Sequence, residues 1–169
     1  GCEAGVGAQS EVKLNDERHV QGRCTRIGSI EMIEAGGHRH LGRYFQALDR
    51  LLAPGGRIVL QAITMPDQKY RAYRLGSDWI RKHIFPGGHL PSLGAITAAM
   101  AATTRLNLVC LEDIGDHYVP TLTRWREALL ARRQEVLALG FDETCLRRWT
   151  YYISYCEAGF RNRLVRNHH

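Results

Sequence analysis

The sequence predicts an α/β fold that contains a pair of parallel strands. Two apolar segments typical of strands, 26–34 (RIGSIEMIE) and 57–63 (RIVLQAI), flank a segment with helical periodicity. This strand–helix–strand order spans about 37 residues, which is the size of a right-handed βαβ unit with parallel strands. The chain has 169 residues, 44% of them hydrophobic and 24% charged, as expected for one soluble globular domain.

The elements of this unit lie in the first half of the chain. Residues 11–14 (EVKL) can form a short strand after an irregular, glycine-rich start. A helix is predicted over 38–53, and Pro54 with the glycines that follow it ends that helix. The continuous apolar run at 57–63 is typical of a strand buried on both faces. The apolar positions that recur along the predicted helix are Leu41, Tyr44, Phe45, Leu48, Leu51 and Leu52.

The second half is predicted to be mostly helical. Residues 65–92 are irregular and rich in aromatic side chains, and Ser92 can cap a helix over 93–104. Residues 106–114 (LNLVCLEDI) form a third predicted strand. A long helix follows from about residue 121 to Gly140, and a last helix starts near Asp142.

Polar side chains stand where the two parallel strands are expected to end. Glu34 ends the first strand, and Gln61 to Thr64 end the second. The simple interpretation of Glu34 is a strand that reaches water. However, ligands in such sheets bind beyond the carboxyl ends of the strands, and polar groups at two neighbouring ends favour a binding site there.

The charge, the spacing of the cysteines and the lack of one glycine motif argue against several classes of protein. The net charge of +6 comes from Lys and Arg spread along the chain, which favours solvated helix faces or an anionic membrane surface, and no nucleic-acid motif accompanies it. The five cysteines lack C-x-x-C spacing, which argues against a zinc site and a disulfide scaffold. No G-x-G-x-x-G motif supports a Rossmann-type dehydrogenase.

Five motifs in order give the chain a family resemblance. They are SIEMIEAGG (29–37), LAPGGRIVLQAI (52–63), HIFPGGHLPS (83–92), DIGDHYVPTLTRWRE (113–127) and YYISYCEAGFRNR (151–163). Together they resemble the cyclopropane-fatty-acyl-phospholipid synthases, a family of S-adenosylmethionine-dependent methyltransferases that includes the mycolic acid cyclopropane synthases. The resemblance covers residues 27–163 of what it implies is one partial methyltransferase domain, 1–169.

The resemblance implies a Rossmann-like class I methyltransferase sheet of strand order 3-2-1-4-5-7-6 with a helical insertion. The family's first glycine-rich motif is not found in this chain. Strands 1 and 2 are therefore expected before Gly1 and strand 7 after His169, so that the sheet is truncated at both ends. Of the strands in that order, only 4 and 5 (26–34 and 57–63) are then expected to keep each other as neighbours.

The resemblance also implies a catalytic site and a bicarbonate ion within it. Glu34 matches the carboxylate that holds the bicarbonate, Ile63 matches a backbone contact to the same ion, and Tyr118 matches the phenol that completes the cage. Gln61 stands where the family usually has a histidine, and it cannot become charged. Cys156 matches a proposed active-site cysteine, although its helical stripe favours a buried structural thiol.

Positions near the cofactor are assigned by the same resemblance. Asp16 aligns with the acidic member of an adenine-contacting pair, and Glu17 stands in place of its aromatic partner. Ile30 aligns near the cofactor, and ordinary core packing explains it equally well. The aromatic side chains of the irregular region can stabilise a cation or simply pack around an acyl chain; they are Tyr70, Tyr73, Trp79 and Phe85.

The function implied is the transfer of a methyl group from S-adenosylmethionine to the double bond of an unsaturated phospholipid acyl chain, closing a cyclopropane ring. One alternative is a methyltransferase that leaves a methyl branch, and another is an inactive fragment that binds anionic membrane. The implied location is the cytoplasm, at the membrane surface, with no nucleic-acid partner. A homodimer is compatible with the resemblance.

Overall fold

The computed structural model describes residues 11, 14, 16 and 19–169. The suggested strand at 11–14 falls largely outside these residues, and so does Glu17. The order of elements is β1 (Cys24–Ile30), short 3₁₀ turns η3 (Ile33–Ala35) and η4 (His38–His40), α1 (Leu41–Leu51), β2 (Leu52–Thr64), α2 (Asp67–Leu75), α3 (Trp79–His83), α4 (Leu93–Thr103), α5 (Gly115–Ala131), α6 (Arg133–Ala138), α7 (Glu143–Arg161) and β3 (Arg166–His168).

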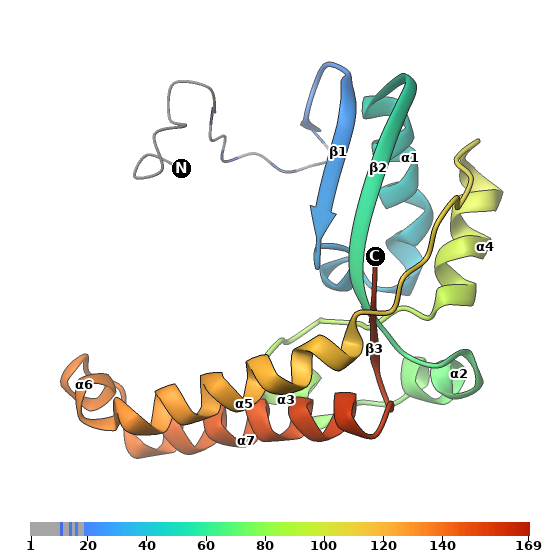
Figure 1. Cartoon of the computed structure of the whole chain (residues 1–169). Helices are drawn as coiled ribbons and strands as arrows, with labels where there is room; N and C mark the ends of the chain where they lie inside the picture. Colours follow the sequence, from blue (N-terminus) through green and yellow to red (C-terminus); the bar gives the residue numbers. More distant parts are fainter. Residues whose placement is uncertain (1–10, 12–13, 15, 17–18) are drawn as a thin grey trace.

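The predicted βαβ unit is confirmed. β1 and β2 are parallel, with Ile27 opposite Ile58 and Ile30 opposite Gln61, and α1 connects them along one face of the pair (Figure 1). β1 ends four residues earlier than the sequence predicts, because Glu31 has a φ of 51° and an extended strand cannot continue through that conformation. Glu34 consequently lies in the η3 turn rather than in the strand.

β2 follows α1 directly and contains a bulge near its start. Cys24 pairs with Leu52, but Arg26 pairs with Arg57, so β2 carries extra residues at this point. Gly55 adopts a φ of +73° within the bulge. A Cβ atom on Gly56 would lie 2.9 Å from two backbone oxygens, so only glycine fits there.

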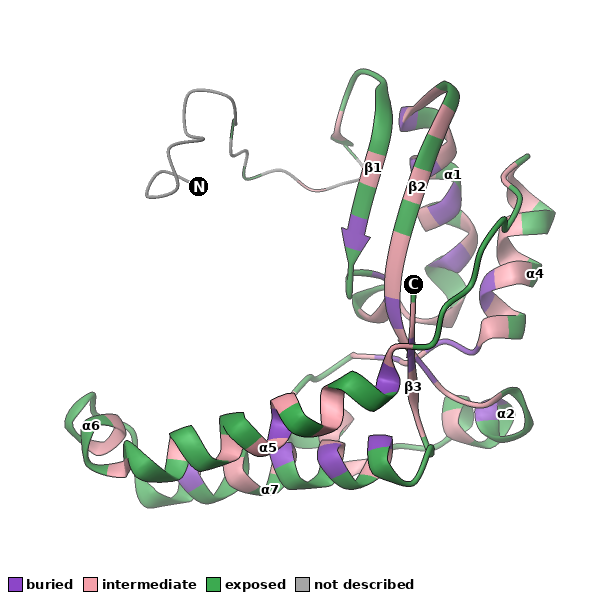
Figure 2. Ribbon diagram, viewed as in Figure 1, coloured by how far each residue is buried: buried purple, intermediate pink, exposed green. Residues whose placement is uncertain are grey.

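Helices cover one face of the β1–β2 pair. Ile33, Phe45, Ala62 and Ile96 are all buried in one cluster, which joins the turn after β1 to α1, β2 and α4. Figure 2 shows this buried band along α1 and exposed positions along both strands. The expectation that β2 is buried on both faces is wrong for the described residues, since Val59 is 58% exposed.

Residues 65–92 are more helical than the sequence suggests. They contain α2 and α3, and the Asp78 side chain caps α3 by accepting from the Arg81 backbone N–H at 2.7 Å. The helix predicted over 93–104 is confirmed as α4, with Ser92 as its cap. The short length of α2 and α3 explains why neither gives a clear helical periodicity.

The third predicted strand, 106–114, is wrong as a regular strand. Val109 is 88% exposed, and only the end of the segment makes sheet-like contacts: the Ile114 backbone N–H donates to the Asn167 carbonyl at 2.7 Å. Its apolar composition favours a strand, but among the described residues nothing pairs with 106–111. Without a partner the ladder of hydrogen bonds does not form.

β3 gives β2 a second neighbour. It is antiparallel to β2, with Ile63 opposite Asn167, and the sheet order is β1-β2-β3. The backbone groups of Glu112 and Ile114 bond to the other side of β3. The expectation that β1 and β2 are each other's only neighbours in this chain is therefore wrong, because the residues after the last helix return to the sheet.

α5 and α7 form an antiparallel pair beside the sheet, joined by α6 (Figure 1). Leu122, Ile153 and Phe160 form its core. Glu157 is 8% exposed and accepts from Arg126 and Arg161 at 3.3 and 2.7 Å, so its buried charge is paired. α5 begins at Gly115, six residues before the predicted start, and this brings Tyr118 into the helix. No helix in the described part of the chain is long and apolar enough to cross a membrane.

Candidate functional site

A group of polar side chains meets where β1, β2 and β3 come together. The Glu31 backbone N–H donates to the Gln61 carbonyl at 2.9 Å, so the residue that follows β1 is fixed beside β2. Its left-handed φ of 51° costs a non-glycine residue about 1 kcal/mol or more. The sheet therefore holds Glu31 in an unfavourable backbone conformation at the carboxyl end of β1.

The Glu31 carboxylate is the acceptor on which this group converges. Its Oε1 atom accepts hydrogen bonds from the Tyr118 hydroxyl, from Gln61 Nε2 at 3.2 Å and from Asn167 Nδ2 at 3.1 Å. Gln61 Nε2 also donates to the Tyr118 oxygen at 3.0 Å. We call these four residues the Glu31 cluster. It joins side chains from β2, α5 and β3 to the residue after β1.

Glu34 lies at the same edge and makes a different contact. Its Oε1 accepts from the Ile63 backbone N–H at 2.7 Å, and its backbone carbonyl accepts from the His89 N–H at 2.8 Å. Burial raises the pKa of the Glu34 carboxyl above its usual range, and the nearby Glu31 carboxylate adds to this. Its second oxygen, Oε2, is buried and has no hydrogen-bond partner among the described residues.

The raised pKa of Glu34 makes a prediction about stability. The folded state favours the protonated carboxyl, so the stabilisation is present below the ordinary pKa of 4.5 and is lost as the pH rises through the folded-state pKa. We expect Glu34→Gln, which keeps an oxygen for the Ile63 N–H, to gain unfolding free energy relative to the parent as the pH rises from 4 to neutrality. Urea unfolding at both pH values measures this, with Glu135→Gln on α6 as the reference. A difference that does not change with pH would contradict it.

Tyr118 is positioned by packing beneath its ring. The ring stacks on Phe160 with centroids 4.9 Å apart, and Phe160 is buried in the α5–α7 core. Gly115 allows α5 to start close to the sheet, since a Cβ there would lie 3.0 Å from Asp113 Oδ1 and 3.4 Å from the Asn167 nitrogen. Burial and the Glu31 carboxylate raise the pKa of Tyr118, so its hydroxyl remains a donor at neutral pH.

The sequence expectation paired Glu34 with Tyr118, and the structure brings Tyr118 to Glu31 instead. Both carboxylates lie at the same edge of the sheet. Glu34 accepts from the backbone of Ile63 and Glu31 accepts from the side chain of Gln61, and these two donors are two residues apart on β2. The described residues show no direct contact between Glu34 and Tyr118. Their proposed shared role in holding an anion stays a prediction.

The remaining predicted site residues lie in different surroundings. Cys156 packs in the α5–α7 core, and burial raises its pKa to about 11, so the thiol is protonated at neutral pH. Ile30 is 69% exposed, which contradicts its interpretation as a core residue. Asp16 is half-buried, and its carbonyl accepts from the His19 N–H.

Asn167 is a member of the cluster that the sequence analysis missed. It is fully buried, and its Oδ1 atom has no hydrogen-bond partner among the described residues. Its short strand follows the last helix, where the apolar pair Leu164–Val165 is the one sequence signal for a return to the sheet. Glu31 was visible as a carboxylate, but its contacts depend on a backbone conformation that side-chain patterns do not reveal.

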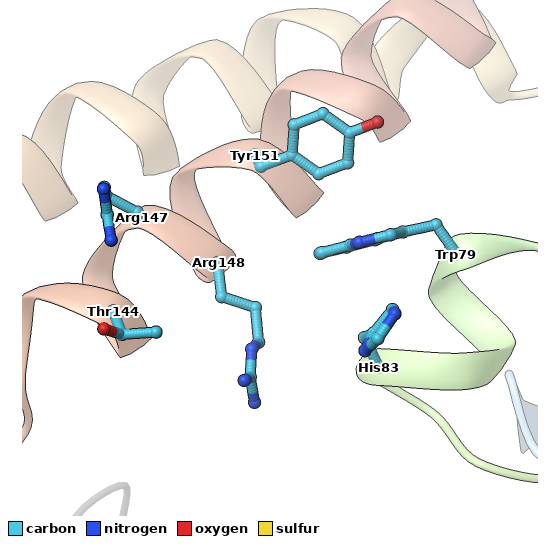
Figure 3. Close-up of a pocket in the computed structure, with 6 residues that line it drawn as sticks. All are labelled: Trp79, His83, Thr144, Arg147, Arg148 and Tyr151. Atoms are coloured by element: carbon cyan, nitrogen blue, oxygen red, sulfur yellow. The ribbon is translucent and has the colours of Figure 1, made fainter.

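The aromatic side chains considered as cation stabilisers are engaged elsewhere. Tyr70 contacts His38 and His89, the Tyr73 hydroxyl accepts from the Leu90 N–H, and Phe85 packs on Tyr152. Trp79 contacts Tyr151 with ring centroids 4.6 Å apart, in an open cleft between α3 and α7. Figure 3 shows that cleft, which Trp79 lines and which none of Glu34, Gln61, Ile63, Tyr118 and Cys156 lines.

Comparisons with known proteins agree with the resemblance in the motifs. A family model described as mycolic acid cyclopropane synthetase matches residues 2–169. The chain belongs to this family. Curated relatives of this cyclopropane synthetase family member include tuberculostearic acid methyltransferase UfaA1 of Mycobacterium tuberculosis, 46% identical over 94% of this chain. Cyclopropane-fatty-acyl-phospholipid synthase of Escherichia coli is 32% identical over 93% of this chain.

Solved structures of the cyclopropane synthetase family share the fold. Mycolic acid cyclopropane synthase CmaA1, crystallised with SAH and CTAB, superposes with a TM-score of 0.84 and 26% identity over 98% of this chain. Cyclopropane synthase MmaA2 from Mycobacterium tuberculosis gives a TM-score of 0.80 at 23% identity. The chain spans 37% and 39% of the lengths of the two curated relatives named above, and 63% of the CmaA1 chain.

Proposed function

We propose that this chain is part of an S-adenosylmethionine-dependent methyltransferase and carries its catalytic residues at the edge of the sheet. The enzyme acts on the carbon–carbon double bond of an acyl chain and leaves a methylene or methyl branch. The observation that carries the proposal is the Glu31 cluster, a carboxylate held by three donors at the carboxyl end of the sheet. Membership in the family and the 46% identity to a tuberculostearic acid methyltransferase support it.

The charge of this edge suits a cation. Glu31 and Glu34 both lie there, and Glu34 Oε2 and Asn167 Oδ1 are two of the buried atoms that have no hydrogen-bond partner among the described residues; both are acceptors. A sulfonium cofactor and a carbocation intermediate are the positive species of the proposed reaction. Ile30, exposed next to Glu31, would give S-adenosylmethionine an apolar contact, and Asp16 would hold its adenine end as the resemblance implies.

A bicarbonate ion does not fit this arrangement. The Ile63 N–H is bonded to Glu34, and the Tyr118 hydroxyl is bonded to Glu31, so both donors assigned to the ion are occupied by carboxylates. Arg163, which precedes β3, and Arg166, which begins it, are paired with Asp116 and Asp113. An anion placed between two carboxylates without a cation would be repelled. We therefore assign no step to bicarbonate.

The protein's own groups can complete the reaction. When bound, S-adenosylmethionine would supply an electrophilic methyl group: the π electrons of the double bond would form the new carbon–carbon bond, and the electron pair of the broken carbon–sulfur bond would stay on sulfur. The adjacent carbon becomes cationic. A proton is then lost to the Glu31 carboxylate, which Tyr118, Gln61 and Asn167 hold in place, because a proton next to a cationic carbon is strongly acidic.

Two products are consistent with this proton loss. Closure of the methyl carbon onto the cation gives a cyclopropane ring, whereas a hydride shift before the proton leaves gives a methylene branch. Both add one CH₂ group. A saturated methyl branch needs one hydride and one proton added across the methylene double bond, so a separate hydride donor must act on the methylene product. The 32% identity to a cyclopropane-fatty-acyl-phospholipid synthase keeps the ring as the second candidate.

The test is product analysis with the chain and any further residues that its reading frame encodes. We expect incubation with S-adenosylmethionine and vesicles of monounsaturated phospholipid to add one CH₂ group, with a vinylidene proton signal in the NMR spectrum of the released fatty acid. Ring protons in place of vinylidene protons would favour the second candidate. No added carbon, together with binding to anionic vesicles, would favour the inactive membrane-binding alternative.

A further inference from the structure

A second cavity, of about 440 Å³, adjoins the segment that carries Glu34. The residues that follow Glu34, from Gly36 to His40, form one wall, and the end of α2, α3 and the loop around His89 form the others. The two sites share a structural element, because the His89 N–H donates to the Glu34 carbonyl at 2.8 Å. We call this space the basic cavity.

The charge of the basic cavity is entirely positive. Arg39, Arg74 and Arg81 line it from three separate segments, and no acidic side chain lines it. Arg81 is partly committed to structure, since its NH1 donates to the carbonyls of Tyr73 and Gly76 at 3.2 and 2.7 Å. The side chains of Arg39 and Arg74 form neither a hydrogen bond nor an ion pair with any described residue. Two guanidinium groups are thus available to a ligand.

Neutral imidazole groups complete the polar lining. The Tyr70 hydroxyl lies between His38 Nδ1 at 2.8 Å and His89 Nε2 at 2.9 Å, which fixes both rings. Burial, followed by the charges of Arg81, His38 and Arg74, lowers the pKa of His89 to about 4. Burial and Arg74 also lower the pKa of His38. The Tyr70 hydroxyl has one proton, so it donates to one ring and accepts the N–H of the other. One imidazole therefore keeps its N–H as a donor for a ligand, and the arginines beside the two rings create a positive potential.

The backbone leaves room for a compact ligand. Gly37 and Gly87 both border the cavity with positive φ angles, and a Cβ atom added to either would meet no atom within 4 Å. The ligand can therefore approach the chain at these points. Guanidinium groups from separate segments, one imidazole N–H and open glycines together match an anion with several oxygen atoms, and phosphate is an anion that arginine binds through paired donors.

We propose that the basic cavity binds a phosphate group, supplied by the headgroup of the phospholipid whose acyl chain enters the neighbouring site. This assignment of the substrate class rests on the function proposed above. The headgroup would be held by Arg39 and Arg74, and the acyl chain would extend toward the Glu31 cluster. A free phosphate compound is the alternative source of the same chemistry.

The binding test uses inorganic phosphate and two matched double variants. Arg39→Gln/Arg74→Gln removes two charges from the basic cavity, and Arg147→Gln/Arg148→Gln removes two exposed charges from the cleft in Figure 3. We expect phosphate to shift the ring resonances of His38 and His89 in the parent. The affinity should fall by about 10- to 100-fold in the first variant and by less than about twofold in the second. Equal losses in both, or no shift of either histidine, would overturn the proposal.

A vesicle arm identifies the source of the phosphate. Flotation with phosphatidylglycerol vesicles is compared with flotation on phosphate-free galactolipid vesicles that carry fatty acid anions at equal charge. We expect stronger binding to the phosphatidylglycerol vesicles, lost in Arg39→Gln/Arg74→Gln. Phosphate binding without this preference would overturn the headgroup assignment. Neither arm measures methyl transfer, so a failure of the proposed reaction remains distinguishable from a failure of the cavity.

Discussion

Replacing Glu31 with glutamine is expected to lower kcat for methyl transfer by about 10²- to 10⁴-fold, the range in which a positioned acid or base contributes. Glutamine keeps the size of the side chain and an oxygen for the Asn167 and Tyr118 donors, but it cannot take the proton from the substrate cation. Single-turnover assays with labelled S-adenosylmethionine measure the chemical step separately from product release.

The controls for this prediction are two other carboxylates. Glu135→Gln on α6 removes an exposed carboxylate that has no contact with the Glu31 cluster, and it should leave kcat within about twofold of the parent. Glu34→Gln tests the competing assignment. If Glu34→Gln lost more activity than Glu31→Gln, the role of proton acceptor would belong to Glu34.

Phe160→Ala is expected to have the largest effect on stability, lowering the unfolding free energy by about 3–5 kcal/mol. Phe160 is 3% exposed, lies in the α5–α7 core and supports the ring of Tyr118. The loss comes from the transfer free energy of the ring and from the cavity that remains. Urea denaturation followed by circular dichroism measures the change.

A second aromatic residue provides the matched control for Phe160. Phe141 is 51% exposed, and Phe141→Ala should cost less than about 1 kcal/mol. The loss of about 3–5 kcal/mol expected for Phe160→Ala is a large part of the stability of an ordinary domain. Phe160→Leu therefore replaces Phe160→Ala if the alanine variant does not fold. Equal effects at positions 141 and 160 would show that Phe160 does not support the core as described.

The sequence was sufficient to predict the βαβ unit, because its strands and helix have distinct hydrophobic periods. The period of α1 and the capping serine of α4 both depend on local chemistry alone. Residues 106–111 show the limit of such reasoning. Their apolar composition is typical of a strand, but a strand also needs a neighbour, and a neighbour is a property of the tertiary structure.

Three of the candidate residues lie together as predicted, but their contacts differ from the prediction. Glu34, Gln61 and Tyr118 do lie at one edge of the sheet, as the strand ends and the resemblance imply. Tyr118 reaches Glu31 because Glu31 has a positive φ and because α5 starts early, at Gly115. Asn167 joins the Glu31 cluster because the three residues of β3, which follow the last helix, pair with β2.

The left-handed backbone at Glu31 creates a conflict between local stability and the side chain at this position. Glycine adopts this conformation freely, and its substitution would relieve local strain while it removes the side chain on which the three donors converge. Under the function proposed for Glu31, some local stability is given up to keep its carboxylate at the edge of the sheet.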